Sequence, residues 1–426
     1  MIKRLFQSRV FKNASWLIVG KVVQMLLSLV VGVLSARYLG PSGYGLISYA
    51  QAYTAFFSAF CTLGINSVLV KELTDAPDKQ GQTLGTSLLL RFASSLLSAL
   101  MIVAIVGVAE RDEPLTVAVV ALSSIGLLFH IFETFNYYFQ SKLRSKVTAI
   151  VTLVAYIVTS IYKIVLLVLG KNVLWFALAT SIDYIVVAIL LYAVYRYGGG
   201  QRLSFSRKRA KEILKRSCHF ILPALMVSIY GYTDKFMLKA MIDEEAISFY
   251  TVAVTVCGMW TFILSAVIDS FYPTIMEAYK TSREIFEKRC RRLYATVFYL
   301  AVFASGAICA LAFWIIYILY GEAFLPAVTP LRIITWYTAF SFLGMARNAW
   351  VVCEEKQKYI KYIYLAAALT NILLNLLLIP PYGAAGAALA SLLTQIVTVF
   401  VIPLLIKPLR RNSVLMMEAI LLRKLK

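Results

Sequence analysis

Residues 84–108, LGTSLLLRFASSLLSALMIVAIVGV, contain a single charged side chain, the cation Arg91. An α-helix needs about 20 predominantly apolar residues to cross the hydrocarbon core of a bilayer, so this stretch predicts a membrane-spanning helix. A cation that faces lipid near the centre of the bilayer costs about 2.5–3.5 kcal/mol on insertion scales. We therefore expect Arg91 to face protein or water.

Apolar stretches of similar length recur along the whole chain. Hydrophobic residues make up 61% of the 426 residues and charged residues 15%, with a mean hydropathy of +0.78, which excludes an ordinary soluble globule. The sequence predicts an all-α integral membrane protein with twelve spans. We place them at residues 14–37, 43–66, 84–108, 115–139, 148–170, 174–195, 218–241, 247–272, 294–318, 331–352, 362–379 and 385–406.

The basic residues are distributed unequally between alternate loops. Of the 42 lysines and arginines, 32 lie in one set of loops and at the two termini, 5 lie in the opposite loops and 5 lie within the spans. Cytoplasmic loops carry an excess of lysine and arginine, so this asymmetry predicts that both termini are cytoplasmic. The net charge of +21 is explained by this orientation signal, and we expect no nucleic-acid partner.

Charged side chains within the spans are the candidate functional residues, because such residues are rare in membranes and mark pathways or relays. The candidate substrate-binding residues, suited to an anionic group, are Lys21, Gln24, Arg91, Lys235 and Arg347. The candidate coupling or gating residues are Asp183, Glu133, His130, Asp234 and Asp269. Two alternatives stay open at this point. Asp183 could be a fixed partner of Lys163 or Lys235, and His130 could be structural.

The longest internal polar segment, residues 196–217, divides the spans into two sets of six. We predict an N-terminal lobe at 1–195, a basic cytoplasmic linker at 196–217 and a C-terminal lobe with its tail at 218–426, with a polar cavity at the centre. The exterior loops are too short for an enzymatic domain, so we expect no catalytic residues and no cofactor. The six cysteines lack metal-ligand spacing, and we expect neither a metal site nor disulfides.

Several loop sequences resemble those of a known family. These are YLGPSGYG at 38–45, GINSVLVKE at 64–72, YTDKFML at 232–238 and LIPPYGAAGAAL at 378–389, which follows Asn371 and Asn375. Together they are similar to the Wzx-type polysaccharide or O-antigen flippases, the oligosaccharidyl-lipid branch of the multidrug/oligosaccharidyl-lipid/polysaccharide exporter superfamily. The resemblance covers essentially the whole chain and implies two six-helix lobes around a central cavity.

The resemblance also implies a function and a substrate. Such a protein would flip oligosaccharides linked to undecaprenyl diphosphate from the cytoplasmic to the outer leaflet of the bacterial inner membrane, by alternating access. The diphosphate would bind the candidate substrate-binding cations. Besides membrane lipid, the resemblance implies a polysaccharide polymerase and a chain-length regulator as partners. Two alternatives remain: a cation-coupled drug exporter of the same superfamily, and a membrane glycosyltransferase or polymerase.

Overall fold

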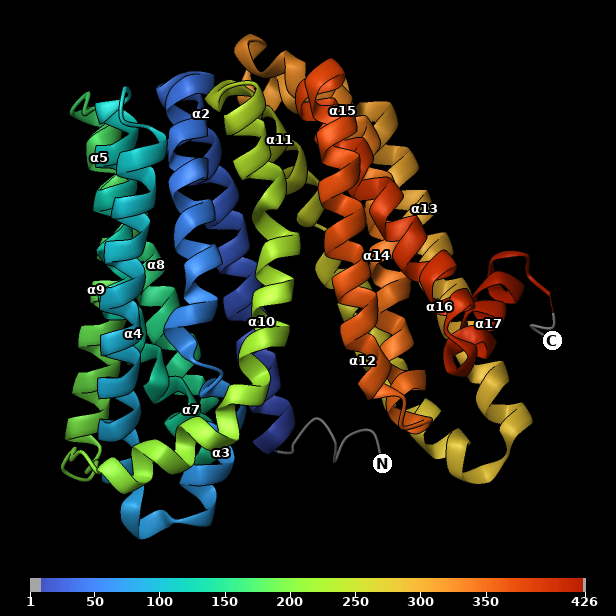
Figure 1. The fold of residues 1–426 in the computed structure, drawn as a ribbon, viewed down its shortest axis with the longest axis horizontal. Helices are drawn as coiled ribbons and strands as arrows, with labels where there is room; N and C mark the ends of the chain where they lie inside the picture. Colours follow the sequence, from blue (N-terminus) through green and yellow to red (C-terminus); the bar gives the residue numbers. More distant parts are fainter. Residues whose placement is uncertain (1–8, 424–426) are drawn as a thin grey trace. The chain divides into compact units, whose positions relative to one another are not determined.

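The computed structural model describes the backbone of residues 9–423 and the side chains from Val23 to Arg423, and all regular structure in this part of the chain is helical. The chain divides into two compact units, one up to Ser228 and one from Ile229 onward, and the boundary falls within helix α10 (Figure 1). Each unit is a bundle of long apolar helices. This confirms the predicted class, an all-α membrane protein.

The first unit is built from α2 (Arg9–Thr62), α3 (Asn66–Asp75), η1 (Pro77–Lys79), α4 (Gln80–Ala109), α5 (Pro114–Ser124), α6 (Gly126–His130), η2 (Ile131–Glu133), α7 (Thr134–Ser141), α8 (Ser145–Val168), α9 (Val173–Tyr197) and the first part of α10 (Arg207–Met241).

The second unit continues with the rest of α10, then α11 (Glu244–Gly258), α12 (Thr261–Thr281), α13 (Arg283–Tyr320), η3 (Glu322–Ala327), α14 (Val328–Cys353), η4 (Gln357–Tyr359), α15 (Ile360–Ile396), the π-helical turn η5 (Val397–Val401), α16 (Ile402–Leu405), η6 (Lys407–Leu409) and α17 (Arg410–Ile420).

The predicted spans all fall on helices of this structure. Eight continuous helical stretches in the described part of the chain are long and apolar enough to cross a membrane, and α11 with α12 forms a ninth that is bent by 43°. Two of the eight, Val23–Asp75 and Gln357–Leu405, have 53 and 49 residues, and a straight helix of that length would measure about 75–80 Å. Both contain a sharp bend, at Gly40 and at Gly383, where the backbone angles are non-helical. The twelve predicted spans require each of these two stretches to cross twice and α14 to supply the remaining span.

Glycines make these two sharp bends possible. Gly40 has φ +67° and Gly383 has φ +54°, in a region that side chains with a Cβ rarely adopt. The chain segment after the second bend also approaches its predecessor closely, because a Cβ on Gly386 would lie 2.0 Å from the carbonyl oxygen of Leu378. The motifs at 38–45 and 378–389 are therefore the turns of two helical hairpins.

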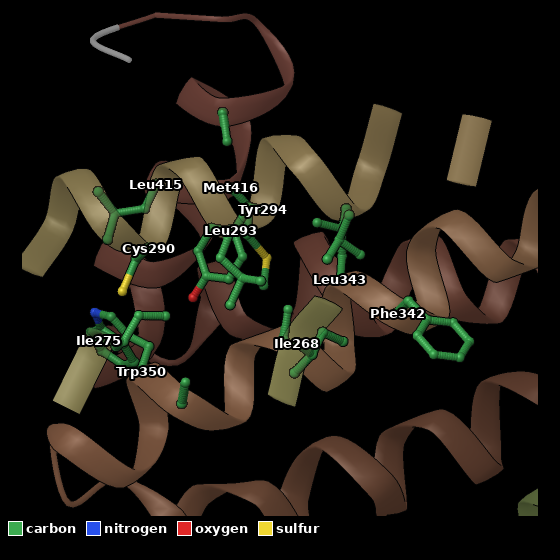
Figure 2. Close-up of a cluster of buried hydrophobic side chains, with 14 of the residues drawn as sticks. Ile268, Ile275, Cys290, Leu293, Tyr294, Phe342, Leu343, Trp350, Leu415 and Met416 are labelled. Carbon is green, nitrogen blue, oxygen red and sulfur yellow. The ribbon is translucent and has the colours of Figure 1, made fainter. Parts of the chain in front are cut away.

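The core of the second unit is a cluster of buried side chains mainly from α12, α13, α14 and α17 (Figure 2). Trp350 of α14 is 1% exposed and lies beside Ile275 of α12, with Cys290 and Tyr294 of α13 nearby. Helix α17 closes this core, because Asn412 donates a 2.6 Å hydrogen bond to the Tyr294 hydroxyl.

Ion pairs hold α17 against α13. Arg291 pairs with Glu418 at 2.6 Å, and Arg411 pairs with Glu287, whose hydrogen bond raises the pKa of the Arg411 guanidinium. The end of the described chain is thus fixed to the second unit.

Candidate functional site

A buried carboxylate lies at the centre of a polar cluster in the second unit. Asp234 of α10 is 4% exposed, although its helix is long enough to cross the membrane. Its Oδ1 accepts a hydrogen bond from Asn375 Nδ2 at 2.6 Å. Its Oδ2 accepts hydrogen bonds from the Tyr250 hydroxyl at 2.5 Å and from Ser391 Oγ at 2.7 Å. Three donors therefore surround one carboxylate, which is the coordination that a buried anion needs.

These donors come from three different spans. Tyr250 lies on α11, whereas Asn375 and Ser391 lie on the two arms of the α15 hairpin. Asn375 Nδ2 also donates to Asn371 Oδ1 at 3.1 Å. Asn375 Oδ1 and Asn371 Nδ2 are buried without a hydrogen-bond partner among the described residues. We call the five residues Asp234, Tyr250, Asn371, Asn375 and Ser391 the Asp234 cluster.

The Asp234 cluster borders a cavity of about 200 Å³ inside the second unit. Tyr230 and Tyr337 lie on another part of its wall, and Gln395 Nε2 contacts their hydroxyls at 2.6 Å and 3.2 Å. A cavity of this size holds several water molecules or a small cation. Asp234, Tyr250 and Ser391 line this cavity.

The first unit contains a buried cation in a comparable position. Arg91 of α4 is 0% exposed. Its Nη1 donates to Thr134 Oγ1 at 2.8 Å and to Asn66 Oδ1 at 3.3 Å, and its Nη2 donates to the carbonyl oxygen of His130 at 3.4 Å. Arg91 Nε is buried without a hydrogen-bond partner among the described residues.

His130 connects this arginine to an acid. Its Nδ1 lies 3.4 Å from Arg91 Nη2, and its Nε2 lies 3.0 Å from Glu133 Oε2. A guanidinium has no acceptor, so the tautomer that satisfies both contacts has Nδ1 accepting from Arg91 and the Nε2–H group donating to Glu133. The ring of Tyr184 packs edge-on against the imidazole at a centroid distance of 5.1 Å. Arg91, His130 and Glu133 therefore form one row, which the sequence had presented as separate candidates.

The remaining acidic candidates lie in different surroundings. Asp183 of α9 is half-buried and accepts a hydrogen bond from Thr159 at 3.2 Å. It also interacts electrostatically with Lys163. Asp269 of α12 is exposed. Neither belongs to the Asp234 cluster.

The remaining basic and polar candidates are also dispersed. Arg347 is 6% exposed and donates to the carbonyl oxygen of Thr398 at 3.3 Å, within the π-helical turn. Lys235 and Gln24 are half-buried, and the side chain of Lys21 lies outside the described residues. Arg91 and Arg347 are thus buried against protein. Lys235, the other candidate cation whose side chain is described, is only half-buried.

Sequence reasoning missed four members of the Asp234 cluster as site residues. Tyr250 and Ser391 were not among the candidates, and Asn371 and Asn375 entered only through a family motif. The signal that could have indicated the asparagines is their i, i+4 spacing inside an apolar span, where amides are costly unless paired. Tyr250 and Ser391 carried no such signal, because hydroxyl groups are common in helix-packing seams.

The described residues offer no group of three or more histidine, cysteine, aspartate or glutamate side chains that could hold a metal ion. The six cysteines, all in the described part, are free thiols.

The two helical units, each with a charged group buried in a long apolar helix, form a fold that solved transporter structures share. A lipid II flippase MurJ in an inward closed conformation is 14% identical with a TM-score of 0.74, over 95% of this chain and 91% of that chain. An inward-facing multidrug resistance MATE family transporter of the MOP superfamily is 16% identical with a TM-score of 0.68, over 92% and 95%. A MOP superfamily transporter from Pyrococcus furiosus is 13% identical with a TM-score of 0.65, over 96% of both chains.

The sequence model of the polysaccharide biosynthesis protein family matches residues 10–279, more than half of the chain. The protein belongs to this family, which confirms the expected resemblance. No curated protein matches the sequence.

Proposed function

We propose that this protein flips oligosaccharides linked to undecaprenyl diphosphate from the cytoplasmic to the outer leaflet by alternating access. The observation that carries the proposal is the membership of the polysaccharide biosynthesis protein family, which selects the substrate class. The fold supports the mode of action, since it is shared with a protein described as a lipid II flippase. Flipping breaks no covalent bond, so the proposal requires no catalytic residue.

Within this proposal, the diphosphate meets two lysines, one in each unit. Lys235 is half-buried and follows Asp234 in the chain, and Lys21 with Gln24 would serve the same role in the first span. Arg91 has its own partners inside the first unit, so its role would be to position His130 and Thr134.

We assign the coupling role to Asp234 ahead of the other acids. It is buried, accepts three hydrogen bonds and borders a cavity, and these conditions let a proton or a small cation compete with its protein donors. Glu133 with His130 and Asp183 in the first unit, and Asp269 in the second, are the further candidates for coupling or gating.

Drug export is the second candidate function, because several solved structures of this fold are multidrug transporters. At 15–16% identity the similarity concerns the fold alone. A cationic drug would need acids on the transport path, whereas a diphosphate needs cations.

Reconstitution into liposomes separates these functions. A defined lipid-linked oligosaccharide is placed in both leaflets, and its accessibility to a membrane-impermeant glycosidase is followed with time. We expect full accessibility with the protein and about half without it, and a Lys235→Ala variant should slow the exchange. Uptake of a cationic dye by the same liposomes, without glycan exchange, would replace the flippase proposal with drug export.

The proposed location is the bacterial inner membrane, with both termini in the cytoplasm. A polysaccharide polymerase and a chain-length regulator are the proposed protein partners, since they act on the glycan after it has been flipped.

A further inference from the structure

An apolar groove lies on the first unit, between α4 and the segment that precedes α10. Its volume is about 330 Å³. Leu88, Leu89 and Phe92 of α4 line one side, and Leu203 and Phe205 line the other. We propose that this groove and the basic helix beside it bind an anionic phospholipid of the cytoplasmic leaflet, with one acyl chain in the groove and the headgroup on the basic side chains.

The wall of the groove is a fixed part of the first unit. Gln201 accepts a 2.8 Å hydrogen bond from the backbone N–H of Gly81, and the N–H of Ser206 donates to Thr86 Oγ1 at 3.1 Å. Gly85 permits this approach, because a Cβ there would lie 2.6 Å from the carbonyl oxygen of Ser204. Residues 201–206 are thus held along α4.

Helix α10 begins next to the groove and is held by a buried acid. Glu72 of α3 is 4% exposed and pairs with Arg209 at 3.2 Å and with Arg216. Both arginines point toward Glu72, with 16% of the Arg209 side chain and 57% of the Arg216 side chain exposed. The opposite side of the helix carries the exposed cations Arg207, Lys208, Lys211 and Lys215, and Arg202 is exposed in the segment before it.

The groove continues into a surface that must face lipid tails. Leu89 and Phe92 are 49% and 41% exposed, and Leu96, Leu97 and Leu100 extend the same exposed apolar surface along α4. The groove begins at Gly85, five residues after the start of α4, or about 8 Å along the helix axis. An acyl chain lying on α4 therefore ends beside the basic residues.

Charge and position together identify the occupant. Clusters of four or more basic residues on an amphipathic helix next to a span attract anionic lipids, by about fivefold in affinity per residue. The apolar groove requires a tail as well as an anionic head, which a soluble phosphate lacks. This inference does not depend on the transported substrate.

The test measures lipid binding to the purified full-length protein by native mass spectrometry, with phosphatidylglycerol and phosphatidylcholine of equal chain length as probes. We expect a preference for phosphatidylglycerol. Replacing both Arg207 and Lys208 with glutamine should weaken phosphatidylglycerol binding by roughly 25-fold. The matched control replaces the exposed Lys358 and Lys361 of the second unit with glutamine and should leave binding unchanged.

A second pair of variants tests the groove itself. Ser204→Trp fills it and Phe205→Ala removes part of its wall, and both keep all cations. Each should weaken binding of long-chain phosphatidylglycerol and leave the dihexanoyl form unaffected, with unchanged thermal unfolding in the absence of added lipid. Equal binding of the two headgroups, an equal loss in the control variant, or full competition by inorganic phosphate would overturn the proposal.

Discussion

Replacement of Asp234 tests whether its carboxylate only stabilises the fold or also couples transport to an ion gradient. In Asp234→Asn, the amide oxygen can still accept from Tyr250 and Ser391, while the new NH2 group faces the Asn375 side chain. Rotation of the Asn375 amide would present its oxygen, which has no partner in the present arrangement, and rotation of Asn371 would present its own unpaired NH2 group. The contacts of Asn375 with position 234 and with Asn371 are then restored with donor and acceptor exchanged, and Asn375 Nδ2 and Asn371 Oδ1 become the unpaired atoms.

The magnitudes follow from this inventory. Hydrogen bonds to a charged group contribute about 1.5–3 kcal/mol and neutral ones about 0.5–1.5 kcal/mol, so exchanging three of them costs about 3–4.5 kcal/mol. Removing a buried charge offsets part of this cost, and we expect Asp234→Asn to lose about 1–2 kcal/mol. Asp234→Ala leaves donors without an acceptor, and a loss of about 3–5 kcal/mol is expected.

Two assays separate stability from coupling. Thermal unfolding in detergent should rank wild type above Asp234→Asn and Asp234→Ala last. Transport in liposomes by the folded Asp234→Asn protein should no longer respond to an imposed proton or sodium gradient, whereas the control Asp78→Asn, at an exposed position of η1, should respond like wild type. An Asp234→Asn protein with the wild-type gradient response would refute the coupling role.

Three further predictions concern packing, the linker and orientation. Gly386→Ala should lower the free energy of unfolding by about 3 kcal/mol because its methyl group meets a backbone carbonyl, whereas Gly306→Ala, which has open space, should be neutral in the same thermal assay. Glu72→Gln should weaken two arginine contacts by about 2 kcal/mol and speed hydrogen exchange roughly 30-fold across residues 201–216; unchanged exchange would exclude the ionic anchor. Reporter fusions at Gly200 and at the C-terminal end should both report cytoplasm, and an exterior signal from either would contradict the topology.

The helices could be predicted from the sequence because the membrane imposes one simple requirement. Every backbone polar group in lipid needs an internal partner, so an apolar stretch of about 20 residues has to be helical. The bends at Gly40 and Gly383 were also predictable, since Gly40 directly precedes Pro41 and Gly383 lies two residues after Pro381, each in a short motif between apolar stretches. The extent of the spans and the hairpins therefore followed from local sequence.

The Asp234 cluster could not be predicted in the same way. Ser391 is 157 residues away from Asp234 in the chain, and the contact exists only after four spans have packed together. For Arg91, the cost of a charge in lipid excluded a side chain that faces lipid. It left a side chain that faces protein and one that faces water. The sequence could not distinguish an arginine that awaits an anionic ligand from one that binds Thr134 and the carbonyl oxygen of His130.

The two buried charges have a common consequence for a moving transporter. Arg91 has its partners within the first unit, and Asp234 has its partners within the second. A rigid-body movement of either unit therefore breaks none of these hydrogen bonds, and it does not expose an unpaired charge to lipid, which would cost several kcal/mol. A ligand that competes for Asp234 acts instead on the packing of α10, α11 and α15 inside the second unit. Coupling would then arise from a change of shape within one unit, rather than from an ion pair broken between the two.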